Sequence, residues 1–262
     1  MIESSVSTSK YNIETDSTGS PTSVGLSYTL MHDAHLLTAT TTIESTHPEV
    51  VDFVRQQIGS IESVRERAVR LFYGVRDEFR YDPYQIDLTI AGMRASSTLA
   101  SRRGWCVSKA ILLAACCRCI GIPARLGFAD VRNHLSTERL RQRMRTDIFY
   151  WHGYTEMLLE GKWVKATPAF NIELCEKFRL LPLDFDGVSD SLYHPFDAAG
   201  NRHMEYVNDR GTYSDLPLEE IIKTFQEKYS FADRSDLRAA SFDADVERES
   251  RDEKGSKTTD GF

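Results

Sequence analysis

The stretch that decides the fold is GWCVSKAILLAACCRCIGIPARL, residues 104–126. Residues 106–120 are apolar almost all round, which predicts a helix buried in the centre of the molecule. Gly121 is suited to end that helix, and Pro123 cannot continue it. Residues 124–131 are then predicted to form a strand.

A hairpin is predicted downstream, in the sequence WHGYTEMLLEGKWVKATPAF at residues 151–170. Residues 150–159 and 162–167 are strand-like, and the Glu160-Gly161 dipeptide between them suits a two-residue turn. Other helices are predicted where apolar residues recur at three- and four-residue steps or helix-starting signals occur. These segments are residues 46–58, 61–79, 171–178 and 217–229.

The two ends of the chain differ from this core. Residues 1–22 are rich in Ser and Thr and predict a flexible N-terminal segment. Residues 232–262 have few large apolar groups and many charges, which predicts a disordered tail whose removal costs little stability. Residues 23–231 are predicted to form one domain, with room for one small satellite.

Composition narrows the class of protein. The 262 residues carry a net charge of −7, which argues against nucleic acid or an anionic membrane as the main partner. No apolar run approaches the roughly 20 residues of a membrane span, and the polar residues 1–20 show no export signal. Three of the five cysteines crowd at residues 116–119. They predict thiols packed in the core of a cytoplasmic protein, not disulfides or a zinc site. No cofactor or metal is expected, since no phosphate-binding or calcium-binding loop is found.

Cys106 is the candidate nucleophile. It starts the predicted buried helix, where the partial positive charge and the free N–H groups favour a thiolate. The same N–H groups can hold a developing oxyanion. An inert buried cysteine remains the alternative on position alone. Trp105 beside it, and Trp151 beside the histidine considered next, are the expected substrate-binding residues.

His152, among aromatic residues on the first hairpin strand, is the candidate base. With a two-residue turn, Leu159 opposes Lys162. Tyr154 then opposes Thr167, and His152 and Thr167 share one face of the sheet as diagonal neighbours. A three-residue loop would send Thr167 to the other face. Thr167 can therefore orient the imidazole only if the turn is tight.

Together these blocks resemble the transglutaminase-like superfamily, in its bacterial, cysteine-peptidase-like form. The shared pattern is Gly-x-Cys at the start of a buried helix, Gly-Ile-Pro-Ala-Arg after it, and a His opening a strand. The segment FRYDPY, residues 79–84, resembles what precedes the cysteine in bacterial and archaeal members. The likeness covers roughly residues 40–215. It implies a papain-like α+β fold in which the Cys helix packs on an antiparallel sheet.

The resemblance also implies acyl transfer on a peptide or small amide substrate. Cys106 would form a thioester from a carboxamide or peptide carbonyl, and His152 would protonate the leaving amine or ammonia. Hydrolysis is slightly favoured over transfer to an amine. One departure stands out, since Thr167 occupies the position where the family usually has Asp. A catalytically silent protein that binds a peptide or protein partner through the same cleft is therefore the alternative. Asn171 and Asp184 are possible substitutes for the missing acid.

Overall fold

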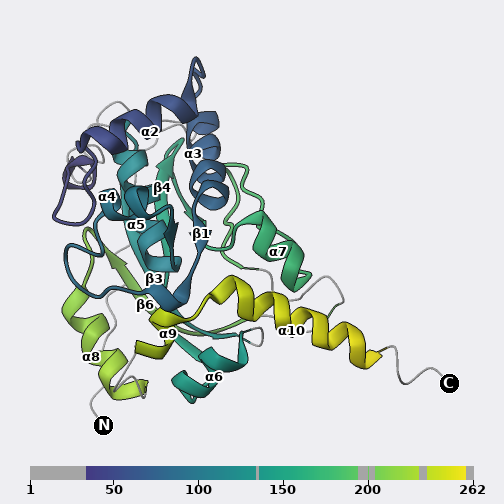
Figure 1. The fold of residues 1–262 in the computed structure, drawn as a ribbon. Helices are drawn as coiled ribbons and strands as arrows, with labels where there is room; N and C mark the ends of the chain where they lie inside the picture. The colour runs from purple at the N-terminus through teal and green to yellow at the C-terminus, as the bar shows by residue number, and fades with distance from the viewer. Residues whose placement is uncertain (1–33, 134–135, 194–199, 201–203, 230–234, 258–262) are drawn as a thin grey trace, which may run out of the picture. The chain divides into compact units, whose positions relative to one another are not determined.

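Helix α5, Cys106–Cys119, lies at the centre of the computed structural model, which describes residues 34–133, 136–193, 200, 204–229 and 235–257 (Figure 1). Every residue of α5 except Cys119 is buried, as the all-round apolar sequence predicts. Two strands and three helices make most of its contacts. They are β3 (Ala124–Asn133), β4 (Ile148–Leu159), α2 (Pro48–Ile58), α3 (Val64–Glu78) and α4 (Ala95–Ser101).

The main sheet has four antiparallel strands in the order β5-β4-β3-β6. Strand β5 is Lys162–Ala166 and strand β6 is Met204–Tyr213. Leu159 pairs with Lys162, which confirms the two-residue turn. Both turn residues have a positive φ, 51° at Glu160 and 81° at Gly161, as a type I′ turn requires. Strand β6 was not expected, because most of its residues are polar or exposed and no apolar pattern marks it.

A β-bulge interrupts the ladder between β3 and β4. Ala129 pairs with His152, but Val131 pairs with Phe149, so β4 carries one extra residue between these two pairs. Trp151 lies in the bulge with a φ of 59°, in the left-handed region that residues other than glycine rarely adopt. As a result His152 and Phe149, three positions apart, both point to the face that Ala129 and Val131 occupy.

Lys109 fixes α5 against its neighbours from inside the core. Its Nζ donates hydrogen bonds to the carbonyls of Arg76 at 2.9 Å, Phe79 at 2.7 Å and Ala169 at 2.7 Å. Burial lowers the pKa of Lys109, whereas three acceptors match the three N–H donors of an ammonium group. The side chain therefore ties α5 to the end of α3 and to the segment after β5.

The remaining elements surround this core (Figure 1). The predicted helices near residues 171 and 217 are confirmed as α7 (Ile172–Phe178) and α8 (Leu218–Lys228). Strands β1 (Arg80–Tyr81) and β2 (Arg103–Gly104) form a short parallel pair just before α5. The short helices are η1 (Ala34–Leu37), η2 (Pro83–Gln85) and α6 (Glu138–Met144). None of the helices in the described part of the chain has both the length and the hydropathy for crossing a bilayer.

The C-terminal segment is ordered where the sequence predicts a disordered tail. Residues 235–257 contain helix α9, Ser235–Ala239, and helix α10, Phe242–Lys257. Leu237, Phe242 and Val246 are buried in the core. The prediction is wrong for these residues because three well-placed apolar side chains suffice to dock an otherwise charged segment. The predicted flexible segment 1–22 lies outside the described residues.

Candidate functional site

Cys106 is the first residue of α5, as predicted. The residue before it, Trp105, has an extended backbone and caps the helix through Ser108. The Trp105 N–H donates to the Ser108 Oγ at 3.0 Å, and that hydroxyl donates to the Trp105 carbonyl oxygen at 3.2 Å. This reciprocal cap holds the backbone on both sides of the thiol in place.

The thiol of Cys106 is buried, and this changes its expected chemistry. Burial raises the pKa of Cys106 to about 11, although the backbone N–H groups of Gly153, Val107 and Cys106 itself act to lower it. The sequence argument expects the helix N-terminus to favour the thiolate, but desolvation outweighs that effect in this closed site. At neutral pH the group is therefore a thiol, and it needs a base to become a nucleophile.

Gly153 brings β4 into direct contact with the first turn of α5. A β-carbon at Gly153 would lie 2.9 Å from the Cα of Val107, closer than real side chains approach. The missing side chain therefore places the residue after His152 against the residue after Cys106. Sequence reasoning overlooked Gly153, yet a glycine inside a strand signals such a close backbone approach.

Cys106 and His152 line one cavity of about 40 Å³. Trp105 also lines it, and aromatic side chains such as Tyr81 and Tyr229 form much of the wall. The structure thus brings the predicted nucleophile, the predicted base and one predicted substrate-binding residue to one apolar pocket. In such a pocket electrostatic interactions are stronger than in water.

Thr167 borders His152 from another side. His152 and Thr167 both line a second cavity of about 20 Å³. Thr167 lies just beyond β5, and its N–H donates to the Ser191 carbonyl at 2.8 Å. The predicted ladder pair of Thr167 with Tyr154 is therefore not formed. The Thr167 hydroxyl is buried and makes no hydrogen bond to any residue that the structure describes.

Three other residues considered from the sequence lie elsewhere. Trp151 lines neither of the two cavities that border His152, and its indole N–H donates to the Thr224 hydroxyl at 2.9 Å. Asn171 accepts the Tyr81 N–H at 3.0 Å through its side-chain oxygen. The side chain of Asp184 is 86% exposed. We therefore assign Trp151 a packing role, and neither proposed substitute for the acid lines the two cavities that border His152.

The other cysteines are core thiols or lie near the core. Burial raises the pKa of Cys117 to about 12, and it also raises the pKa of Cys116. Burial also raises the pKa of Cys175, which lines the cavity shared by His152 and Thr167, to about 11. Within the described ranges no cluster of His, Cys, Asp and Glu could hold a metal ion.

Comparison with known proteins finds a family whose model matches the elements that carry Cys106 and His152. The model of the transglutaminase-like superfamily matches residues 51–168, from α2 to just past β5. A candidate cysteine protease from Cytophaga hutchinsonii has a similar solved structure, at 18% identity and a TM-score of 0.42, covering 70% of this chain and 54% of its own. A candidate protease from Parabacteroides distasonis matches at 18% identity and a TM-score of 0.34, covering 51% of this chain and 26% of its own. The chain thus spans about half of the first protein and a quarter of the second. No curated protein sequence matches it.

Proposed function

Because the chain belongs to the transglutaminase-like superfamily through residues 51–168, we propose that it is a cysteine-dependent acyl-transfer enzyme. In this proposal Cys106 is the nucleophile, His152 the general acid and base, and Thr167 a positioning residue. The substrate is a peptide or a small amide. The observation that carries the proposal is the single cavity lined by both Cys106 and His152.

Because the Cys106 thiol is protonated at neutral pH, a base must remove its proton before the sulfur can react. His152 takes the Cys106 proton as the sulfur attacks the substrate carbonyl carbon. Backbone N–H groups at the first turn of α5 and at Gly153 already act on the sulfur, so they are suitably placed for the oxyanion that forms beside it. Because the folded backbone already holds these donors in place, they need little reorganisation at the moment of reaction.

The second half of the cycle regenerates the thiol. The C–N bond breaks, and the imidazolium of His152 gives its proton to the leaving ammonia or amine. Water then attacks the carbonyl carbon of the Cys106 thioester while His152 accepts a proton from it. The C–S bond breaks, the acid is released, and His152 returns the proton to the sulfur. An amine in place of water would give a new amide. We favour hydrolysis because water is always available, and among the described residues that line the cavity none is an Asp or Glu that could bind an amine.

A silent binding protein is the second candidate, and one observation favours it. Thr167 carries no charge, and its hydroxyl makes no hydrogen bond to the imidazole in this structure. A neutral third residue supports the imidazolium less than a carboxylate does. In this alternative the same apolar cavity would hold a side chain of a partner without reacting.

Replacing the nucleophile tests the enzyme directly. Cys106→Ala should reduce ammonia release from glutamine peptides, and labelled-amine incorporation into them, to the background rate. The protein should keep its circular dichroism spectrum and melting temperature. Cys175→Ala is the matched control, because Cys175 is also a buried thiol beside His152 but should retain activity. Full turnover by folded Cys106→Ala would exclude this mechanism, and the ratio of ammonia release to amine incorporation separates hydrolysis from transfer.

A further inference from the structure

One wall of the Cys106 cavity comes from outside the family core. Leu237, on helix α9, lines the cavity together with Cys106 and His152. It is only 2% exposed, and it lies 69 residues beyond the family match, which ends at residue 168. The C-terminal segment of this chain therefore completes a pocket whose reactive residues come from the shared core.

Aromatic packing holds α10 beside the same pocket. Phe242, the first residue of α10, makes edge-on contacts with Tyr84 and Tyr81, at ring-centroid distances of 5.2 Å and 5.9 Å. Both tyrosines line the Cys106 cavity. Pairs of this kind add about 0.5–1.5 kcal/mol each beyond the apolar area that they bury. The contact therefore keeps the end of α9, and with it Leu237, close to the cavity wall.

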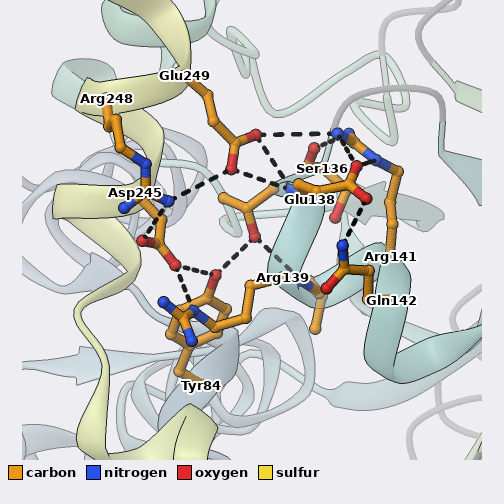
Figure 2. Close-up of polar contacts among 11 residues, drawn as sticks. Tyr84, Ser136, Glu138, Arg139, Arg141, Gln142, Asp245, Arg248 and Glu249 are labelled. Atoms are coloured by element: carbon orange, nitrogen blue, oxygen red, sulfur yellow. Dashed lines mark hydrogen bonds and ion pairs between the residues drawn. The ribbon is translucent and has the colours of Figure 1, made fainter.

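A buried carboxylate forms a second attachment (Figure 2). Asp245 of α10 accepts hydrogen bonds from the Tyr84 hydroxyl at 2.9 Å and from the Arg139 guanidinium at 2.7 Å, and it pairs with Arg248 at 2.8 Å. Burial acts to raise the pKa of Asp245, but these hydrogen bonds outweigh it and lower the pKa. The attachment is therefore ionised, and complete, at neutral pH.

Helix α10 also caps helix α6. The Glu249 carboxylate accepts the Glu138 N–H, at 3.0 Å and 3.1 Å to its two oxygens (Figure 2). A negative charge at a helix N-terminus is favourable, and it satisfies an N–H that has no partner within the helix. Two charged side chains one turn apart thus fix α10 to two different elements, η2 and α6.

We propose that Leu237 sets the largest acyl group that can reach Cys106, with α10 holding it in position. The inference rests on the proposed function and adds a substrate class to it. A water molecule needs roughly 10–15 Å³ of cavity volume. The cavity at Cys106 measures about 40 Å³, so it has room for about three non-hydrogen atoms. The carboxamide group at the end of an unbranched side chain has about three such atoms, its carbon, oxygen and nitrogen. A branched or aromatic acyl group would instead clash with the Leu237 side chain.

Alkylation of Cys106 with a small and a large reagent tests this without requiring turnover. The second-order rate constants for iodoacetamide and N-benzyl iodoacetamide are measured by mass spectrometry at Cys106. Wild type should strongly prefer the small reagent. Leu237→Ala should reduce that preference by about tenfold or more, since single methylene groups in apolar pockets discriminate by roughly 10–200-fold. Leu237→Met, which conserves volume, should keep the preference of wild type.

Val246→Ala is the matched control, because Val246 is fully buried on α10 and lines no part of this cavity. It should lose stability and keep the size preference. Equal ratios in wild type and Leu237→Ala would overturn the proposal, as would an equal change in Val246→Ala. A folded protein whose Cys106 stays unreactive in every variant would overturn it too. A size shift in a protein without turnover would support Leu237 as the wall and contradict only the proposed function.

Discussion

At the scale of single residues, two opposing effects act on one thiol. The helix N-terminus and three backbone N–H groups favour the charged form of Cys106, while its burial favours the neutral form. Burial wins, and the resting pKa of about 11 leaves roughly one thiol in ten thousand ionised at pH 7. The balance shifts when a base accepts the proton or when the site opens, so in the proposed mechanism the reactivity of the thiol depends on His152 and its neighbour Thr167.

Substitutions at Thr167 test this balance through the pH dependence of Cys106 alkylation. In wild type the rate should rise as the pH approaches the raised pKa of the thiol, because only the thiolate reacts. Thr167→Asp should extend the reaction to lower pH, since a carboxylate stabilises the imidazolium and hence the thiolate beside it. Thr167→Ala should lower turnover, because positioned acid–base catalysis contributes about 10²–10⁴-fold.

Rate profiles by mass spectrometry, from pH 5 to pH 11, separate the outcomes. Coincident curves for wild type, Thr167→Ala and Thr167→Asp would show that Thr167 does not act on the imidazole. Accelerated alkylation in Thr167→Asp alone would identify a silent binding protein that has lost its acid. Thr155→Ala is a suitable control, because Thr155 is also a buried threonine of the sheet but its hydroxyl donates to the Ala110 carbonyl.

At the scale of elements, α5 is held by the hydrogen bonds of the Lys109 side chain as well as by apolar packing. Lys109→Met should lower the free energy of unfolding by about 3 kcal/mol or more, because it leaves three buried carbonyls without a donor at about 1–3 kcal/mol each. Urea denaturation gives the value. Lys162→Met is the control, since the exposed Lys162 also donates to a carbonyl, that of Val188 at 3.0 Å. It should change stability by less than about 0.5 kcal/mol, and similar losses in the two variants would contradict the argument.

The elements that sequence could predict are those with strong local signals. The apolar run of α5, the stop at Gly121 and the Glu160-Gly161 turn were sufficient to predict the central helix and the register of the hairpin. Strand β6 carries no such signal, because it is a largely exposed edge strand. The position of Thr167 was also missed in part, since pairing with Ser191 takes it out of the ladder. Such long-range contacts leave no mark on local periodicity.

The features of the candidate site also divide into those that the sequence predicts and those that it does not. Cys106, His152 and Trp105 were identified from motif and position, and they meet at one cavity. The raised pKa of the thiol and the wall at Leu237 depend on burial by segments distant in sequence. The spacing of residues in the sequence does not reveal this burial. The raised pKa of Cys106 and the position of Leu237 could therefore not be predicted from the sequence.

At the scale of the whole molecule, the C-terminal helices should contribute measurably to stability. Deleting residues 232–262 removes the buried side chains of Leu237, Phe242 and Val246, each worth about 1.5–3 kcal/mol when fully buried. We expect a loss of about 3 kcal/mol or more, a fall in melting temperature of about 6–12 °C for a protein of this size. Cys106 should also alkylate faster, because opening the cavity returns its pKa toward the ordinary range.

Differential scanning calorimetry of the shortened and full chains measures the effect. Deleting residues 1–22, which the sequence predicts to be flexible, is the control and should leave the melting temperature unchanged. An unchanged melting temperature in the C-terminal deletion would show that α9 and α10 do not dock in solution. It would also remove the basis for the role of Leu237.

The bulge at Trp151 decides which side chains of β4 lie on the same face as His152. Because β4 carries one extra residue between the pairs of His152 and Phe149, the side chains on its two sides are out of step with simple alternation. If the same residues formed a regular strand without the bulge, His152 and Phe149, three positions apart, would point to opposite faces. Only one of them could then line the cavity that both line in this structure. The length of this strand, as well as the identity of its side chains, therefore decides which residues line the cavity.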